Sequence, residues 1–113
     1  MDIEDIQKQL SDFANERDWD QFHNPKNLAM ALSVEASELV EIFQWLTPEQ
    51  AEAIMSSNES EHVKEEIADI MIYLIRMADK LNVDLENAVT DKIVKNGKRY
   101  PVSLSKGNAK KIT

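Results

Sequence analysis

The sequence predicts an all-α protein that folds as a helical bundle in one domain. The 113 residues include only two Gly and three Pro, and apolar side chains recur every three or four positions over long stretches. That spacing places apolar side chains on one face of an α-helix. A chain of this length can bury one hydrophobic core but not two. We therefore expect four to five helices in a single domain over residues 1–113.

Apolar spacing and capping residues place the individual helices. Apolar residues from Ile3 to Phe13 repeat at helical spacing. Asn24 followed by Pro25 is a helix start, with Asn as the N-cap and Pro at the first helical position. Thr47 precedes a second Pro in the same way, and Asp84 is a further good N-cap. Helices are expected over residues 2–16, 25–45, 48–55 (a short turn or helix), 60–81 and 85–99, with connectors at 18–24 and 56–60 and an irregular tail after Ser103.

The composition excludes several kinds of site. The absence of Cys rules out thiolate zinc sites, disulfides and a cysteine nucleophile. Two His leave no credible Ser-His-Asp set, and there is no Gly-rich loop to cradle a phosphate. The chain does not open on a basic and apolar leader, and no apolar run is long enough to span a bilayer. We expect a soluble, cytoplasmic protein without a membrane partner.

Charge is distributed unevenly along the chain, whose net charge is −8. All 21 acidic residues lie at or before Asp91, whereas seven of the 13 Lys and Arg lie after it. An acidic body disfavours binding to nucleic acids. A basic tail beside an acidic metal site would suit a polyphosphate, and the alternative is a solvated helix end and extension.

Two acidic pairs are placed where solvent-facing charges are not expected. Glu35 and Glu38 are spaced i, i+3, so they share one face of their helix. At about 100° per residue, Glu35 falls inside the apolar arc and Glu38 at its edge, while Glu41 points to solvent. Glu66 and Asp69 repeat the spacing on a second apolar helix. A carboxylate among apolar side chains must be neutralised, paired or bound to a metal.

The two pairs offer up to eight carboxylate oxygens, the ligands that hard divalent cations prefer. The sequence therefore predicts a Mg²⁺ site, with Mn²⁺ as a substitute, held by two helices. The alternative is that the four residues are ordinary surface charges at another helical phase.

The segment 67–75 is apolar almost all round, because Ile72 and Ile75 lie away from its main apolar stripe of Ile70, Leu74, Met77 and Leu81. A helix of that kind is buried on most sides. A chain of this size rarely buries one helix so fully, so we expect a homo-oligomer, either a dimer or a tetramer.

Other side chains suggest weaker alternatives. Glu59 and His62 form an E-x-x-H, as in di-iron bundles, but those need two such motifs. His62 is therefore expected to face solvent near a helix start. Trp19, Trp45 and Tyr73 would stack on a base or pack at the core and its rim. The polar residues of the last helix, Lys92, Lys95, Asn96, Lys98 and Arg99, would hold phosphates or complement the helix dipole.

Several stretches together resemble one known family: FANERDWDQFHNPKNLAMAL, EASELVEIFQW, EEIADIMIYLI and VDLENAV followed by KNGKRYP. They cover nearly all of the chain from Phe13 to Lys111. The chain is similar to the MazG-like all-α nucleoside triphosphate pyrophosphohydrolases, and within them to the dCTP pyrophosphatase branch. The two acidic pairs alone are a moderately specific signal for this family, and their combination with RDWxQFHxPKNL and RYP is a strong one. Family members are helical bundles that assemble as dimers or tetramers and bind Mg²⁺ between the acidic pairs.

The resemblance implies roles for particular residues. Its metal set is Glu35, Glu38, Glu66 and Asp69. Its candidates for the substrate pocket are Trp19, His23, Asn27, Trp45 and Tyr73, and those for the phosphates are Lys92, Asn96, Arg99 and Tyr100. Vertebrate relatives carry a His near the position of Leu10, where this chain has no polar group, so the selectivity for a base stays open.

Two functions from different classes follow. The first is an enzyme that hydrolyses a nucleoside triphosphate, dCTP or a modified pyrimidine deoxynucleotide, to a monophosphate and pyrophosphate and so cleans the nucleotide pool. In that enzyme Glu35 and Glu38 are candidate catalytic residues, and Glu35 is either a metal ligand or the base that activates water. The second is a non-catalytic helical interaction or regulatory module that retains the fold.

Overall fold

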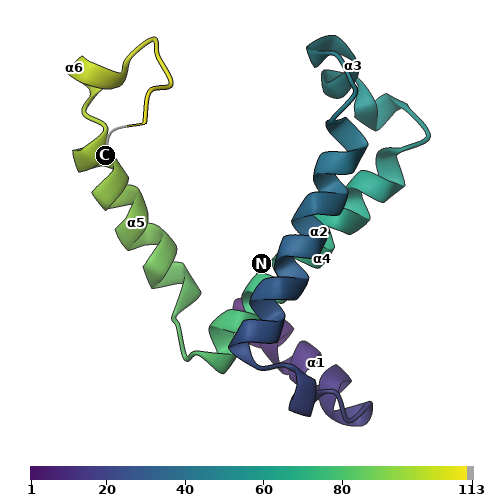
Figure 1. Cartoon of the computed structure of the whole chain (residues 1–113). Helices are drawn as coiled ribbons and strands as arrows, with labels where there is room; N and C mark the ends of the chain where they lie inside the picture. Colours follow the sequence, from purple (N-terminus) through teal and green to yellow (C-terminus); the bar gives the residue numbers. More distant parts are fainter. Residues whose placement is uncertain (112–113) are drawn as a thin grey trace. The chain divides into compact units, whose positions relative to one another are not determined.

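The computed structural model describes residues 1–111, which form helices joined by short connections and no strand. The elements are α1 (Ile3–Glu16), η1 (Asp20–Phe22), α2 (Pro25–Phe43), α3 (Pro48–Glu52), η2 (Ile54–Ser56), α4 (Ser60–Lys80), α5 (Leu85–Arg99) and α6 (Val102–Ser105), where η marks a 3₁₀ helix (Figure 1). The predicted all-α class is confirmed, and α1 to α5 are the five predicted helices.

Local capping accounts for the helix starts. The side chain of Asn24 accepts a hydrogen bond from the Asn27 backbone N–H at 2.9 Å, and Pro25 is the first residue of α2. Asp84 caps α5 in the same way through the Asn87 N–H at 3.1 Å. Thr47 begins α3 with a reciprocal capping box. The predicted starts of these three helices are therefore correct.

One local prediction is incomplete and one is wrong. The connector at 18–24 contains a 3₁₀ turn, Asp20–Phe22. The tail after Ser103 is not simply irregular, because Val102–Ser105 form one helical turn. In that turn the carbonyl of Pro101 accepts from the backbone N–H groups of Leu104 and Ser105 at 3.0 and 3.1 Å.

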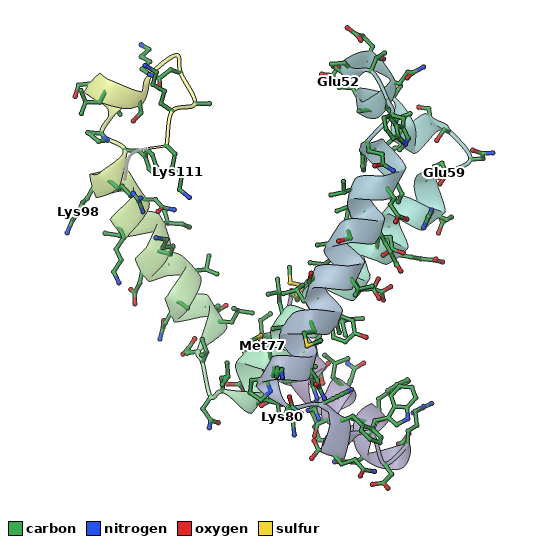
Figure 2. The ribbon with its side chains drawn as sticks, viewed as in Figure 1. Glu52, Glu59, Met77, Lys80, Lys98 and Lys111 are labelled. Atoms are coloured by element: carbon green, nitrogen blue, oxygen red, sulfur yellow. The ribbon has the colours of Figure 1, made fainter. Side chains whose placement is uncertain are left out.

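The chain forms two compact units, Met1–Asn82 and Val83–Thr113. In the first unit α2 and α4 lie side by side, α3 and η2 connect them at one end, and α1 packs against α4 (Figure 1). Glu52 and Glu59 mark the α3 end, and Met77 and Lys80 the other end (Figure 2). In the second unit, α5 buries none of its residues.

The core of the first unit lies on both sides of α4. Ile75 is 1% exposed and Leu28 of α2 is 2% exposed. The predicted apolar stripe of α4 is wrong for Leu74 and Leu81, which are exposed. Because α4 packs against both α1 and α2, residues outside that stripe, such as Ala78, are buried instead.

None of the helices within residues 1–111 combines the length and the apolar character that crossing a membrane requires.

Candidate functional site

An acidic cluster lies where α2 and α4 run side by side. Glu35 and Glu38 lie one turn apart on α2, and Glu66 belongs to α4. Each offers one carboxylate oxygen, and these oxygens all lie within 4.8 Å of one another. Glu66 is 7% exposed and both α2 residues are partly buried, whereas Glu41 is exposed. The helical phase predicted for Glu35 is therefore correct.

Two oxygens of the cluster are buried without a hydrogen-bond partner, Oε2 of Glu35 and Oε2 of Glu66. A buried carboxylate oxygen without a donor is costly. Protonated Glu35 would donate to Glu66. That hydrogen bond, together with burial and the charge of Glu38, raises the pKa of Glu35 to about 7. The metal-free cluster thus holds a proton close to neutral pH.

These features fit a hard divalent cation. Three carboxylates from two helices supply oxygen ligands, and the cation would satisfy the two oxygens that lack a donor. Asp69, the fourth predicted ligand, is not part of this group of three. It lies three residues beyond Glu66 on α4, is half-buried, and lines the neighbouring cavity.

His62 adjoins the acidic cluster. Its Nδ1 lies 3.0 Å from Oε2 of Glu59, and its Nε2 lies 3.5 Å from Oε1 of Glu66. The hydrogen bond with Glu59 and the charge of Glu66 raise the pKa of His62. The side chain is half exposed, as predicted.

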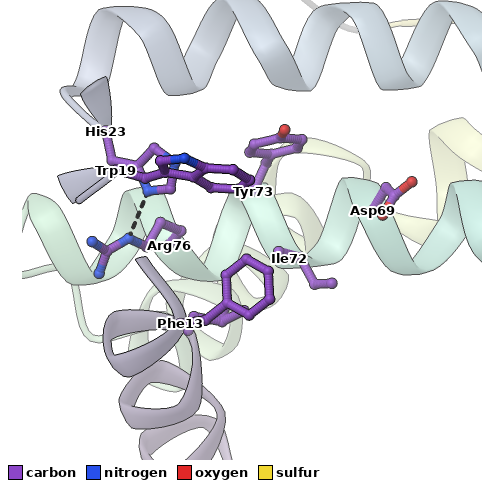
Figure 3. Close-up of a pocket in the computed structure, with 8 residues that line it drawn as sticks. Phe13, Trp19, His23, Asp69, Ile72, Tyr73 and Arg76 are labelled. Atoms are coloured by element: carbon purple, nitrogen blue, oxygen red, sulfur yellow. Dashed lines mark hydrogen bonds between the residues drawn. The ribbon is translucent and has the colours of Figure 1, made fainter. Parts of the chain in front are cut away.

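A largely apolar cavity of about 370 Å³ lies between α1, the 18–24 connector and α4 (Figure 3). Its size is in the range of small-molecule sites. Its lining residues are Leu10, Phe13, Trp19, His23, Asp69, Ile72, Tyr73 and Arg76. Asp69, which lines the cavity, lies one helical turn along α4 from Glu66 of the acidic cluster.

Aromatic rings form much of the cavity wall. The rings of Phe13 and Trp19 meet edge to face with their centroids 5.7 Å apart. The guanidinium of Arg17 lies over the Phe13 ring, 3.5 Å from its centroid. Burial, followed by the charges of Glu35 and Asp69, raises the pKa of the Tyr73 hydroxyl. These rings offer flat, apolar faces to a ligand.

Arg76 is the buried cation of the cavity and is only 4% exposed. Its Nη2 donates to Oδ1 of Asp20 at 2.6 Å, its Nε donates to Nδ1 of His23 at 3.2 Å, and its Nη1 lies 3.6 Å from Oδ2 of Asp79. Lys80 also donates to Oδ1 of Asp20. A buried guanidinium needs such partners. The network ties the connector that carries Trp19 and His23 to α4.

The structure brings some predicted pocket residues together and separates others. Trp19, His23 and Tyr73 line one cavity. Trp45 lies after the end of α2, is 86% exposed and does not line this cavity. The side-chain amide of Asn27 donates to the Phe22 carbonyl at 3.0 Å, which fastens the connector to the start of α2.

The predicted phosphate-side residues belong to the second unit. Lys92, Asn96 and Arg99 lie on α5, and Tyr100 is its C-cap residue. The Arg99 guanidinium lies 5.8 Å from the centroid of the Tyr100 ring.

Sequence reasoning missed Phe13, Asp20, Ile72 and Arg76 as residues of the site. A signal for Arg76 was present, because Asp69, Tyr73 and Arg76 follow one another at i, i+4 and i+7 and so share one helical face. Asp20 offered no comparable signal, since its partner Arg76 lies 56 residues away in sequence.

Comparison with known proteins relates this site to one family. The MazG-like family model matches residues 30–113. The chain is 46% identical to dCTP pyrophosphatase 1 of Bos taurus and 43% identical to that of Homo sapiens, in both cases over 112 residues. These matches cover 98% of this chain and 66% of each relative, so the chain spans about two thirds of their length.

A solved structure supports the same relationship. A pyrophosphatase from Archaeoglobus fulgidus matches with a TM-score of 0.82 and 37% identity, over 89% of this chain and 94% of that one. The fold of the chain is thus that of a known pyrophosphatase. Because the family model, the curated relatives and the solved structure agree, the chain belongs to the MazG-like family.

Proposed function

We propose that this chain is a Mg²⁺-dependent nucleoside triphosphate pyrophosphohydrolase. It would hydrolyse a deoxynucleoside triphosphate, dCTP or a modified pyrimidine analogue, to the monophosphate and pyrophosphate, and so remove surplus or non-standard nucleotides from the pool. The observation that carries the proposal is the acidic cluster of Glu35, Glu38 and Glu66 one helical turn from an aromatic cavity. The names of its relatives support the reaction and the base.

The acidic residues would divide the chemical work. Glu35, Glu38 and Glu66 would hold the cation, with Asp69 as a fourth ligand from the next turn of α4. Bound Mg²⁺ would neutralise phosphate charge and make water a better nucleophile. Glu35, whose pKa is raised to about 7 in the metal-free cluster, would act either as a metal ligand or as the base that takes the proton of the attacking water, since a bound cation would lower that pKa again. Glu38 is the second candidate for the base.

The cavity would bind the nucleoside. The rings of Trp19 and Tyr73 offer stacking faces to a base, an interaction worth about 1–3 kcal/mol per base. His23 adds a polar group to the same wall, and Asn27 fixes the connector. Trp45, Lys92, Asn96, Arg99 and Tyr100 stay candidates for contacts with the substrate through the family resemblance.

We further propose that residues 1–113 act as one pyrophosphohydrolase domain, because the family model extends over parts of both compact units. The protein would work as a homo-oligomer, which a later prediction tests.

A panel of canonical and modified deoxynucleoside triphosphates with Mg²⁺ tests the reaction, with products resolved by phosphorus NMR. Pyrophosphate and a monophosphate are expected, with dCTP turned over faster than the other canonical substrates. In ¹⁸O-labelled water the label should enter the monophosphate, because attack at the α phosphorus breaks the bond to the β phosphate. Orthophosphate as the only product would contradict the proposal. The absence of turnover from a folded protein would favour the non-catalytic module instead.

A further inference from the structure

His23 lines the cavity, and its contact with the buried Arg76 determines which of its ring nitrogens carries the hydrogen. His23 lies at the end of the 18–24 connector, and its Nδ1 is 3.2 Å from Nε of Arg76. An arginine Nε always carries a hydrogen and cannot accept. Nδ1 of His23 is therefore the acceptor in this bond and carries no hydrogen.

The protonation of the second ring nitrogen follows from the first. A neutral imidazole carries its single hydrogen on one nitrogen, so His23 carries it on Nε2. A second hydrogen on Nδ1 would point at the Nε–H of Arg76. Burial and the charge of Arg76 accordingly lower the pKa of His23. His23 is a neutral donor with a fixed tautomer.

Arg76 is itself held in place. Its Nη2 bonds to Asp20 at 2.6 Å and its Nη1 lies 3.6 Å from Asp79, while its side chain is 4% exposed. The guanidinium therefore has little freedom to turn away from His23. Asp20 belongs to the same short connector as His23, so the connector carries both the anchor of Arg76 and the ring that Arg76 orients.

Nε2 of His23 has no bonded partner among residues 1–111, and His23 lines the cavity beside Trp19 and Tyr73 (Figure 3). The wall around it is mainly apolar. A hydrogen-bond donor in such surroundings favours the binding of a ligand that places an acceptor atom next to it, and it disfavours a ligand that places a donor there.

We propose that Arg76, anchored by Asp20, is a positioning residue that fixes His23 as an Nε2–H donor, and that this donor hydrogen-bonds an acceptor atom of the base, a carbonyl oxygen or an unprotonated ring nitrogen, in the cavity. This proposal rests on the nucleotide pocket proposed above. It assigns one hydrogen bond to the base to a fixed tautomer of His23, in addition to ring stacking.

The tautomer can be measured without any substrate. Long-range ¹H–¹⁵N correlation spectra distinguish the two neutral tautomers from the imidazolium. The chain has only two His, so His62→Gln assigns both signals. We expect His23 to be the Nε2–H form at neutral pH in the wild-type protein and to become a mixture of tautomers in Arg76→Met. A wild-type His23 found as the Nδ1–H tautomer or as imidazolium would overturn the proposal, even if Arg76→Met does not fold.

Lys80→Met provides the matched control. Lys80 donates to the same Asp20 oxygen as Arg76 and acts on His23 through its charge alone, since no hydrogen bond joins the two among the described residues. This variant should keep the Nε2–H tautomer. A change as large as that in Arg76→Met would mean that general disturbance of the connector, and not the Arg76–His23 bond, sets the tautomer.

Binding of the product analogue dCMP, measured by calorimetry, tests the donor. His23→Leu should weaken dCMP binding about tenfold, the worth of one hydrogen bond. His23→Gln, which retains one acceptor and one donor, should largely restore it. 2-Deoxyribose 5-phosphate, which lacks the base, should bind the wild-type protein and both variants equally.

Equal dCMP affinity in wild type and His23→Leu would overturn the role of the donor, and a wild-type protein that fails to bind dCMP would overturn the ligand class. Neither measurement uses turnover. A protein with the expected tautomer and dCMP affinity but without hydrolytic activity would refute the proposed reaction alone.

Discussion

Glu35 combines burial, a neighbouring acid and a raised pKa in one side chain. In the metal-free protein its ionised form is penalised when folded, so its pKa of about 7 lies above the ordinary 4.5. The folded state then holds a proton that the unfolded state releases. This lowers the free energy of unfolding progressively as pH rises from 4.5 to 7, and the penalty is full above pH 7.

Glu35→Gln removes this penalty. We expect the melting temperature of the metal-free variant to exceed that of the wild-type protein by a margin that widens from pH 5 to about pH 7 and then stays constant, measured by calorimetric scanning. Glu41→Gln on the same helix is the control, because Glu41 is exposed. A melting-temperature difference between wild type and Glu35→Gln that does not change with pH would show that burial does not destabilise ionised Glu35.

Hydrolysis by Glu35→Gln should fall at least about 10²-fold.

Glu66 is the most buried member of the acidic cluster, at 7% exposed. Glu66→Gln keeps the shape of the side chain but removes a charged ligand. We expect Mg²⁺ affinity to fall at least about tenfold. Mutation of a residue that only hydrogen-bonds to a metal ligand already weakens metal binding by about this much. Titration calorimetry measures this, with the neighbouring exposed Glu65→Gln as the control. Unchanged affinity in Glu66→Gln would place the cation elsewhere.

At the scale of elements, the pairing of α2 with α4 holds the acidic cluster together. Leu28 of α2 is 2% exposed and packs in that core. Leu28→Ala should lower the free energy of unfolding by about 2–5 kcal/mol, because it loses apolar contacts and leaves a cavity.

Urea unfolding of Leu28→Ala measures that loss, and Val40→Ala on the same helix, 60% exposed, should change stability by less than about 0.5 kcal/mol. Equal destabilisation by the two changes would mean that the α2 face assigned to the core is wrong.

At the scale of the whole molecule, α4 leaves apolar surface uncovered within the unit Met1–Asn82. Ile67, Met71 and Leu74 are 54%, 39% and 39% exposed. A monomer with such a surface would bind a second copy to bury it. We expect light scattering to give at least twice the chain mass of 12.9 kDa at micromolar concentration. Ile67→Lys should shift the mass towards the monomer, while a wild-type mass near 13 kDa would refute self-association.

The positions of the helices could be predicted from the amino-acid sequence alone. Their starts depend on local contacts, such as Asn24 with Asn27 three residues later, and such contacts can be found by spacing alone. The phase of Glu35 and Glu38 was also predictable, because a single helix fixes which residues share a face. The repeated i, i+3 spacing also led to the prediction of one site, of which Glu35, Glu38 and Glu66 lie together whereas Asp69 lies outside that group of three.

How the helices pack against one another could not be predicted in this way and became clear from the three-dimensional structure. It buried Ile75 and exposed Leu74, because α4 packs against two neighbours whose directions no local pattern encodes. It also joined Arg76 to Asp20 and His23, residues more than 50 positions apart, and thereby fixed a hydrogen-bond donor in the cavity. Periodicity reports the faces of one helix, whereas the partner of each face depends on how the entire core packs.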